Sequence, residues 1–130
     1  GDERKLEEVT EEMRKMAENM DGQDPEKVKE IVRRALQQMA NDNPEVSEQL
    51  RELAKRKGTS PSEVIKDLAE QVWRAMERAR EGDKDTAREL IRKFADDLGI
   101  SPEQVKKFIK IMREVQRKED GSLEHHHHHH

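Results

Sequence analysis

The four prolines of this chain each follow an Asp, Asn or Ser, and this arrangement divides the sequence into helical segments. Such a residue accepts hydrogen bonds from the free N–H groups of a helix's first turn, and proline at the first helical position loses only an unpartnered N–H. The four pairs are Asp24-Pro25, Asn43-Pro44, Ser60-Pro61 and Ser101-Pro102. Single glycines mark most of the opposite ends, because glycine closes a helix in the left-handed conformation.

Between these boundaries the apolar residues recur every three or four positions, as in Leu6, Val9, Met13 and Met16. That spacing lines one face of an α-helix. With 43% charged and 31% hydrophobic residues, composition alone would favour disorder. Disorder does not produce regular stripes, so the periodicity is stronger evidence than the composition. Six helices are predicted, at residues 3–20, 25–40, 44–57, 61–81, 84–98 and 102–118.

The predicted fold is all-α: a single compact domain of six helices joined by short loops, covering residues 1–120. The unequal helix lengths disfavour an up-and-down bundle, which prefers matched helices, and favour crossed, non-bundle packing. A regular bundle and a helical-repeat array remain the alternatives. Residues 121–130, Gly-Ser-Leu-Glu followed by six histidines, are interpreted as a linker and a purification His-tag.

Several functional classes have little support in the residues. The chain has no cysteine, and all six histidines lie in the terminal run, so zinc–thiolate sites and histidine-activated nucleophiles are unavailable to residues 1–120. The acidic turns at 41–43 and 83–85 lack the ligand spacing of a calcium loop. No apolar run is long enough to span a membrane. We expect no enzyme activity, and we assign no catalytic, cofactor-binding or metal-binding residue.

One segment is similar to the turn of helix-turn-helix DNA-binding domains, at residues 95–105, and a similar string occurs at 54–64. In that family the second helix enters the major groove and its first residues contact bases. Carried over, the reading residues would be Glu103, Gln104, Lys106 and Lys107, with Lys110 near a phosphate.

Acidic residues oppose this interpretation of both strings. Glu63 and Asp67 stand where the earlier string would face DNA, and Asp96 and Asp97 lie near the later turn. The net charge of −4 is also unfavourable, because phosphate neutralisation supplies much of nucleic-acid affinity. Residues 51–60 also resemble the helical half of ribbon-helix-helix repressors, but no basic strand precedes them. We expect each of the two strings to form a compact helix–loop–helix corner, and we expect no nucleic-acid partner.

Other features have structural explanations. The basic run 55–57 closes a helix, where cations complement the helix dipole. Met13, Met16 and Met20 are expected to fill the core, with an adaptable partner groove as the alternative. Trp73 is expected to anchor the core with its N–H near the surface, and a partner hot spot is the alternative. Pairs of opposite charge four residues apart include Glu11–Lys15, Glu30–Arg34, Glu52–Arg56, Glu70–Arg74 and Glu103–Lys107.

Taken together, the capped prolines, terminal glycines, minimal loops, charge-rich surface and aliphatic core resemble de novo designed all-α proteins. The resemblance covers residues 1–120 and the His-tag. It implies a stable helical scaffold with no natural biological function and no partner, monomeric and soluble in the cytoplasm of an expression host. A designed protein-binding module is the alternative, and a helix-turn-helix-like DNA-binding domain is more distant. Crossing angles, oligomeric state and the order of the core are left open.

Overall fold

The computed structural model describes the backbone of residues 2–128 and the side chains of residues 3–120. Over this range the chain forms six α-helices and no strand, which confirms an all-α single domain. The helices are α1 (Asp2–Asn19), α2 (Pro25–Asp42), α3 (Pro44–Lys57), α4 (Pro61–Arg80), α5 (Lys84–Leu98) and α6 (Pro102–His128). None of them combines the length and apolarity that a membrane span requires.

The polar residues before the prolines cap the helices as predicted. The Asp24 carboxylate accepts the Glu26 backbone N–H at 3.1 Å, and the Asn43 amide oxygen accepts that of Glu45 at 3.1 Å. At the other ends of α3 and α5, Gly58 and Gly99 adopt left-handed φ angles of 66° and 65°. These contacts fix where each helix begins and ends, and they leave room only for short loops.

The sequence predicts two capping boxes, in which the side chains of Glu63 and Gln104 bond back to the N–H groups of Ser60 and Ser101 three residues earlier. The two sites differ in the structure. At α6, Ser101 Oγ accepts the Gln104 N–H at 3.3 Å, and Gln104 Oε1 accepts the Ser101 N–H at 2.9 Å. At α4, Ser60 Oγ accepts the Glu63 N–H at 3.2 Å, but the Glu63 carboxylate lies 3.9 Å from Lys66 Nζ. The prediction of a reciprocal bond from Glu63 is therefore wrong, because a lysine on the same helix face attracts its carboxylate.

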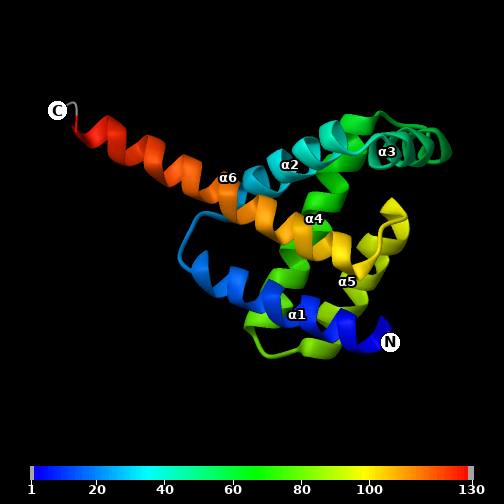
Figure 1. The fold of residues 1–130 in the computed structure, drawn as a ribbon, viewed down its shortest axis with the longest axis horizontal. Helices are drawn as coiled ribbons and strands as arrows, with labels where there is room; N and C mark the ends of the chain where they lie inside the picture. Colours follow the sequence, from blue (N-terminus) through cyan, green and yellow to red (C-terminus); the bar gives the residue numbers. More distant parts are fainter. Residues whose placement is uncertain (1, 129–130) are drawn as a thin grey trace.

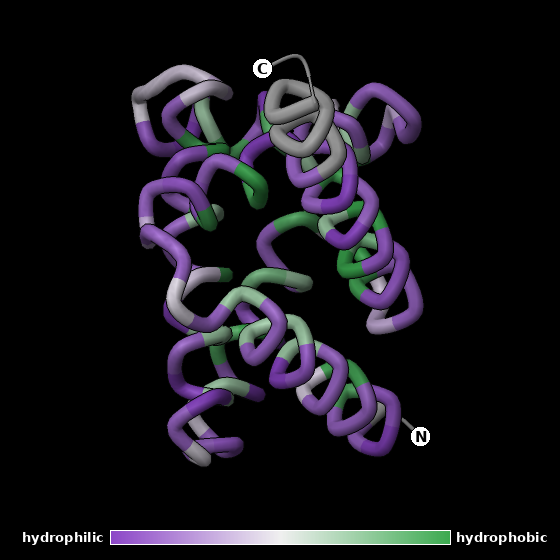
Figure 2. The backbone as a smooth tube through the Cα atoms, turned by 90° about the vertical axis from the view of Figure 1, so that its left-hand side faces the viewer, coloured by the Kyte–Doolittle hydropathy of each residue, from purple (hydrophilic) through white to green (hydrophobic). Residues whose placement is uncertain are grey.

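Helix α4 occupies the centre of the fold. It packs against α1, α2, α3 and α5, whereas α6 packs against α1 and α2. In Figure 1 α4 runs steeply across the directions of α1 and α6, which is the crossed arrangement predicted from unequal helix lengths. Figure 2 shows hydrophobic positions on the sides of the helices that face their neighbours, with hydrophilic positions outward.

The core between these helices is almost wholly apolar. The largest fully buried side chains include Phe94, Phe108, Met13 and Met16. Thr10 is the one buried polar residue among those described, and its hydroxyl donates to the Leu6 carbonyl at 2.7 Å. A buried polar group costs free energy unless it is hydrogen-bonded, so this bond accommodates the hydroxyl within the helix.

Helix α6 is longer than predicted. The sequence placed its end at residue 118 and a linker from residue 121, but the helix continues to His128. No proline follows Pro102, and a glycine within a helix costs only about 1 kcal/mol relative to alanine, so Gly121 does not by itself terminate it. Helix propagation adds one hydrogen bond for each residue fixed, which favours continuation from an established helix.

Smaller differences affect four other boundaries, and one of them is the start of α1, which lies at Asp2, one residue before its predicted position. Helix α2 extends to Asp42, two residues beyond its predicted end. The reason is that the backbone N–H of Asn43 donates to the Met39 carbonyl at 2.9 Å and so adds a last helical hydrogen bond. Helices α1 and α4 each end one residue earlier than predicted, at Asn19 and Arg80. None of these shifts changes which helical faces are buried.

Candidate functional site

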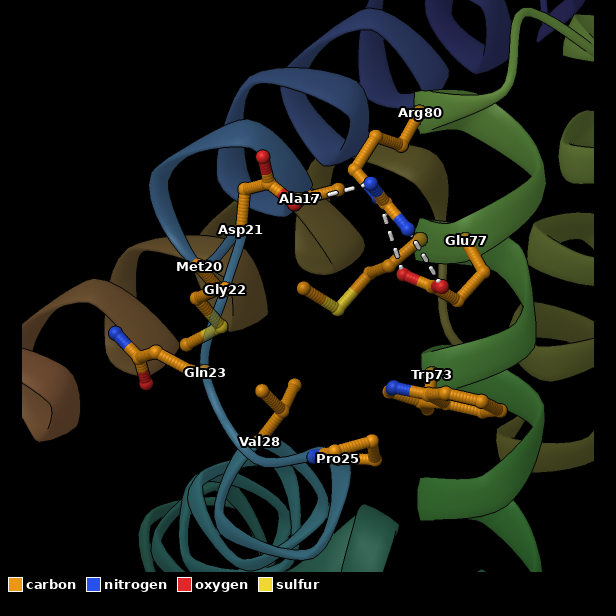
Figure 3. A pocket seen from close by; sticks show the side chains of 11 residues that line it. Ala17, Met20, Asp21, Gly22, Gln23, Pro25, Val28, Trp73, Glu77 and Arg80 are labelled. Atoms are coloured by element: carbon orange, nitrogen blue, oxygen red, sulfur yellow. Dashed lines mark hydrogen bonds and ion pairs between the residues drawn. The ribbon is translucent and has the colours of Figure 1, made fainter.

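A cleft of about 180 Å³ lies between the end of α1, the loop to α2 and the C-terminal half of α4 (Figure 3). Ala17, Met20, Val28 and Met76 contribute its apolar part, and all four are buried residues of the core. The remaining lining residues lie at the rim or in the loop: Asp21, Gly22, Gln23, Pro25, Trp73, Glu77 and Arg80.

An ion-pair network closes one side of this cleft. Arg80 donates from Nη1 to Asp21 at 3.0 Å and from Nη2 to Glu77 at 2.8 Å, and so joins α4 to the loop that follows α1. These contacts, chiefly the hydrogen bond to Glu77, raise the pKa of Arg80 above its ordinary value. The guanidinium therefore remains a cation, and it is already shared between two carboxylates. An arginine held as a cation in this way does not serve as a general base.

Trp73 forms another wall of the cleft and is half-buried against the core. Lys29 Nζ, from α2, lies 4.7 Å from the ring centroid and 2.9 Å from the Glu70 carboxylate. The hydrogen bond to Glu70 is the main reason that the pKa of Lys29 is raised. Sequence reasoning predicted a tryptophan packed on the core but missed this cation–π contact, because only the crossing of α2 and α4 brings the two residues together.

Three other hollows lie on the surface and have charged linings. They measure about 410 Å³ beside Arg92, 350 Å³ beside Arg113 and 340 Å³ beside Arg88. Each arginine pairs with an acidic side chain, namely Glu3 at 2.8 Å, Glu12 at 3.0 Å and Asp85 at 3.1 Å. Within the described part of the chain, no group of three or more His, Cys, Asp or Glu side chains could hold a metal ion.

The residues proposed to read DNA are mostly engaged within the fold. Gln104 caps its own helix, Lys106 Nζ lies 2.9 Å from the Glu8 carboxylate, and Glu103 lies 3.8 Å from Lys5 Nζ. Lys107 and Lys110 are exposed on α6, and no ion pair is found for either within residues 3–120. The start of α6 is thus tied to α1, in a way the local motif did not indicate.

The ion pairs also differ from those predicted along single helices. Of the five pairs, only Glu30–Arg34 is formed within the described residues, at 3.4 Å. Three of the other four acids have different partners: Glu11 pairs with Arg14, Glu70 with Lys29 and Glu103 with Lys5. A helical spacing of four permits a pair, but the lysines and arginines of neighbouring helices compete for the same carboxylates.

The methionines occupy the positions that core packing requires. Met13 and Met16 are fully buried and Met20 is 4% exposed, so all three belong to the core, and Met20 also lines the cleft. The basic residues at 55–57 form the last turn of α3, where sequence analysis placed them.

No protein-family model matches the chain, and no curated protein shows significant similarity to it.

Proposed function

We propose that the chain is a designed helical scaffold whose sequence encodes a stable fold and no catalytic or binding task. The observation that carries this proposal is the complete separation of apolar and charged side chains. Within residues 3–120 every buried side chain except Thr10 is apolar, and no Ala, Val, Ile, Leu, Met, Phe or Trp is exposed. Ala40, Trp73, Leu90 and Ile111 are half-buried against the core.

The ionisable groups support the same proposal. Active sites hold groups whose pKa is shifted by burial or by a specific charge toward the working pH. Here the pKa shifts of Glu8, Glu11 and Lys106 arise mainly from hydrogen bonds in surface ion pairs, and that of Asp83 from the capping of Thr86. All of them stabilise the charged form and move the group away from neutral pH.

The alternative of a protein-binding module lacks a specific supporting contact surface. Binding faces are marked by contiguous exposed apolar area, with aromatic anchors at the centre. The four half-buried apolar residues are distributed over four different helices, α2, α4, α5 and α6. We therefore favour a monomer without a dedicated partner, soluble in the host that expresses it.

Four measurements on the full chain test the proposal. Light scattering after size exclusion should give the monomer mass, and urea unfolding should give one cooperative transition. A two-dimensional amide spectrum should show sharp, dispersed peaks, because a loosely packed aliphatic core would broaden them. A gel-shift assay with random duplex DNA at physiological salt should show no complex. A dimer, a broad transition or a salt-dependent DNA complex would contradict the proposal.

A further inference from the structure

We propose that Asp21 is a site of spontaneous isomerisation, in which the aspartate converts to isoaspartate through a cyclic imide formed with Gly22. The scaffold proposal does not depend on this chemistry, so the two can fail separately. The reaction needs an aspartate followed by an accessible backbone amide, and glycine hinders the attack least because it has no side chain. The chain contains two Asp-Gly steps, Asp21-Gly22 and Asp120-Gly121, and no Asn-Gly step.

The first of these steps lies in an exposed turn between α1 and α2. The Gln23 N–H donates to the Met20 carbonyl at 3.1 Å, and Gly22, at the third position of this turn, has a φ of 85°. The Gly22 N–H itself has no hydrogen-bond acceptor among residues 3–120, and both Asp21 and Gly22 are exposed. The attacking nitrogen and the water that the reaction needs are therefore both available at this step.

The reaction consumes and returns one water molecule and needs no other reactant. The Gly22 nitrogen forms a bond to Cγ of Asp21 in its carboxylic acid form, and the carboxyl hydroxyl leaves with the amide proton as water. Water then adds to the Asp21 backbone carbonyl carbon and breaks its bond to the Gly22 nitrogen, which regains a proton. The main chain now runs through Cβ and Cγ, and the new carboxylate stands on Cα. Attack of water at Cγ instead restores the aspartate.

The ion pair with Arg80 opposes the first bond-forming step. Asp21 Oδ1 accepts a hydrogen bond from Arg80 Nη1 at 3.0 Å, and Figure 3 shows the carboxylate directed towards the guanidinium. The carboxyl group must turn away from Arg80 to bring Cγ to the Gly22 nitrogen. The restraint is weak, because the Asp21 side chain is 65% exposed, and an exposed ion pair slows such a step by no more than about fivefold.

The second Asp-Gly step lies within α6, whose backbone is helical to His128. In a helix each N–H donates to the carbonyl four residues earlier, so the Gly121 nitrogen must lose this bond before it can attack Asp120. The loss of one such hydrogen bond slows the reaction by about two- to tenfold. The same pair of residue types should therefore react faster in the turn than in the helix.

The experiment follows isoaspartate in the full chain during incubation at about pH 6, where acid unfolding is not expected. Trypsin separates the two steps, because Asp21 lies in the peptide of residues 16–27 and Asp120 in that of residues 119–130. Isoaspartate gives a peptide of unchanged mass and altered retention. We expect it to form about two- to tenfold faster at Asp21 than at Asp120 in the folded chain, and at similar rates in urea above the unfolding transition. Equal rates in the folded chain, or the same preference in urea, would overturn the proposal.

Two arginine variants test the restraint on the carboxylate. Arg80→Leu removes the hydrogen bond to Asp21 and should speed its isomerisation about two- to fivefold, with the rate at Asp120 unchanged. Arg78→Leu is the matched control, because Arg78 also lies in the last turn of α4 but faces Asp83 at 3.9 Å, and it should leave both rates unchanged. No acceleration in the first variant, or equal acceleration in both, would contradict the role given to Arg80.

A third variant assigns the product to Asp21. The peptide of residues 16–27 also contains Asp24, but Pro25 follows it and has no N–H to lose. Asp21→Glu keeps a carboxylate in the turn, yet its longer side chain would have to close a larger ring onto the Gly22 nitrogen. The isomerised peptide should therefore disappear in this variant, and its persistence at the original rate would overturn the assignment.

Discussion

The ring of Phe94 in α5 lies against the ring of Phe108 in α6, with centroids 5.2 Å apart and an interplanar angle of 43°. Both side chains are fully buried and are the only phenylalanines in the chain. A tilted pair at this distance combines area burial with a favourable aromatic contact. This pair closes the corner between α5 and α6. The sequence of that corner is similar to the turn of helix-turn-helix DNA-binding domains.

Replacing Phe108 by alanine should therefore lower the free energy of unfolding by about 3–5 kcal/mol, because it removes a large buried side chain and leaves a cavity. Urea unfolding followed by circular dichroism measures this change. Ile111→Ala, three residues further along α6 and only half-buried, is the matched control and should cost clearly less. Equal losses in the two variants would mean that the aromatic pair does not anchor the corner.

The difference between the two serine caps gives a second prediction. Gln104→Ala removes the reciprocal hydrogen bond to the Ser101 N–H, and should lower the free energy of unfolding by about 0.5–1 kcal/mol. Glu63→Ala at the equivalent position of α4 removes no such bond and should have a smaller effect. Thermal unfolding of both variants gives the comparison, and a larger loss for the Glu63 variant would contradict the assigned geometry.

Local chemistry in the sequence predicted the helices, their caps and their buried faces. Asp24, Asn43 and Ser101 cap as expected because an N-cap depends only on residues within one turn. The end of α6 was predicted wrongly, since the end of a helix without a strong stop depends on weak propensities. The sequence could predict that the helices cross but not their crossing angles, because ridge-and-groove packing between distant segments determines these angles.

The candidate cleft could not be predicted from the sequence, for the same reason. Trp73 stood out as a half-buried aromatic, but Arg80, Asp21 and Lys29 carry no local signal that they surround it. Their contacts join residues 59 and 44 positions apart. Four of the five charge pairs named along single helices do not form among residues 3–120, and one reason is that Glu70 pairs with Lys29 of another helix.

The pH dependence of stability follows from the surface ion pairs. The pKa of Glu8 is lowered from 4.5, mainly by its hydrogen bond from Lys106, and the pKa values of Glu11 and Glu30 are lowered by arginine contacts. A carboxyl whose pKa is lower in the folded state contributes stability above its unfolded value, and this is lost as pH falls through the folded pKa. The pKa of Lys106 is raised above 10.5, so its contribution is lost only as pH rises beyond that value.

Stability should therefore be constant across neutral pH and decline below 4.5, the ordinary pKa of these glutamates. Urea midpoints measured from neutral pH down to about pH 3 test this. Glu8→Gln removes one of the contributing carboxyls and should show a smaller acid-induced loss than the unaltered chain. A midpoint that changes through neutral pH would contradict the assignment, because residues 3–120 contain no histidine to titrate there.

The left-handed end of α3 gives a further prediction. A Cβ built at Gly58 would meet no atom within 4 Å, so the cost of substitution comes from its φ of 66° and not from a clash. Gly58→Ala should lower the free energy of unfolding by about 1–2 kcal/mol, whereas Gly58→Asn should cost less because asparagine tolerates this conformation. Denaturant unfolding of the pair tests the conformation, and equal costs would argue against a left-handed cap.

The length of α6 leads to the last prediction. The buried residues that α6 contributes to the described core end at Val115, and the last ion pair with another helix among residues 3–120 joins Glu119 to Arg34. A chain that stops at Asp120 keeps both, so its free energy of unfolding should differ from that of the full chain by less than about 0.5 kcal/mol. Its helical circular dichroism signal should fall only by the share of the removed turns. A chain that stops at Glu114 is the control, because it loses Val115 and Glu119 together and should be clearly less stable. If removing residues 121–130 were as damaging as that deeper truncation, the folding domain would extend beyond residue 120, against the boundary drawn from the sequence.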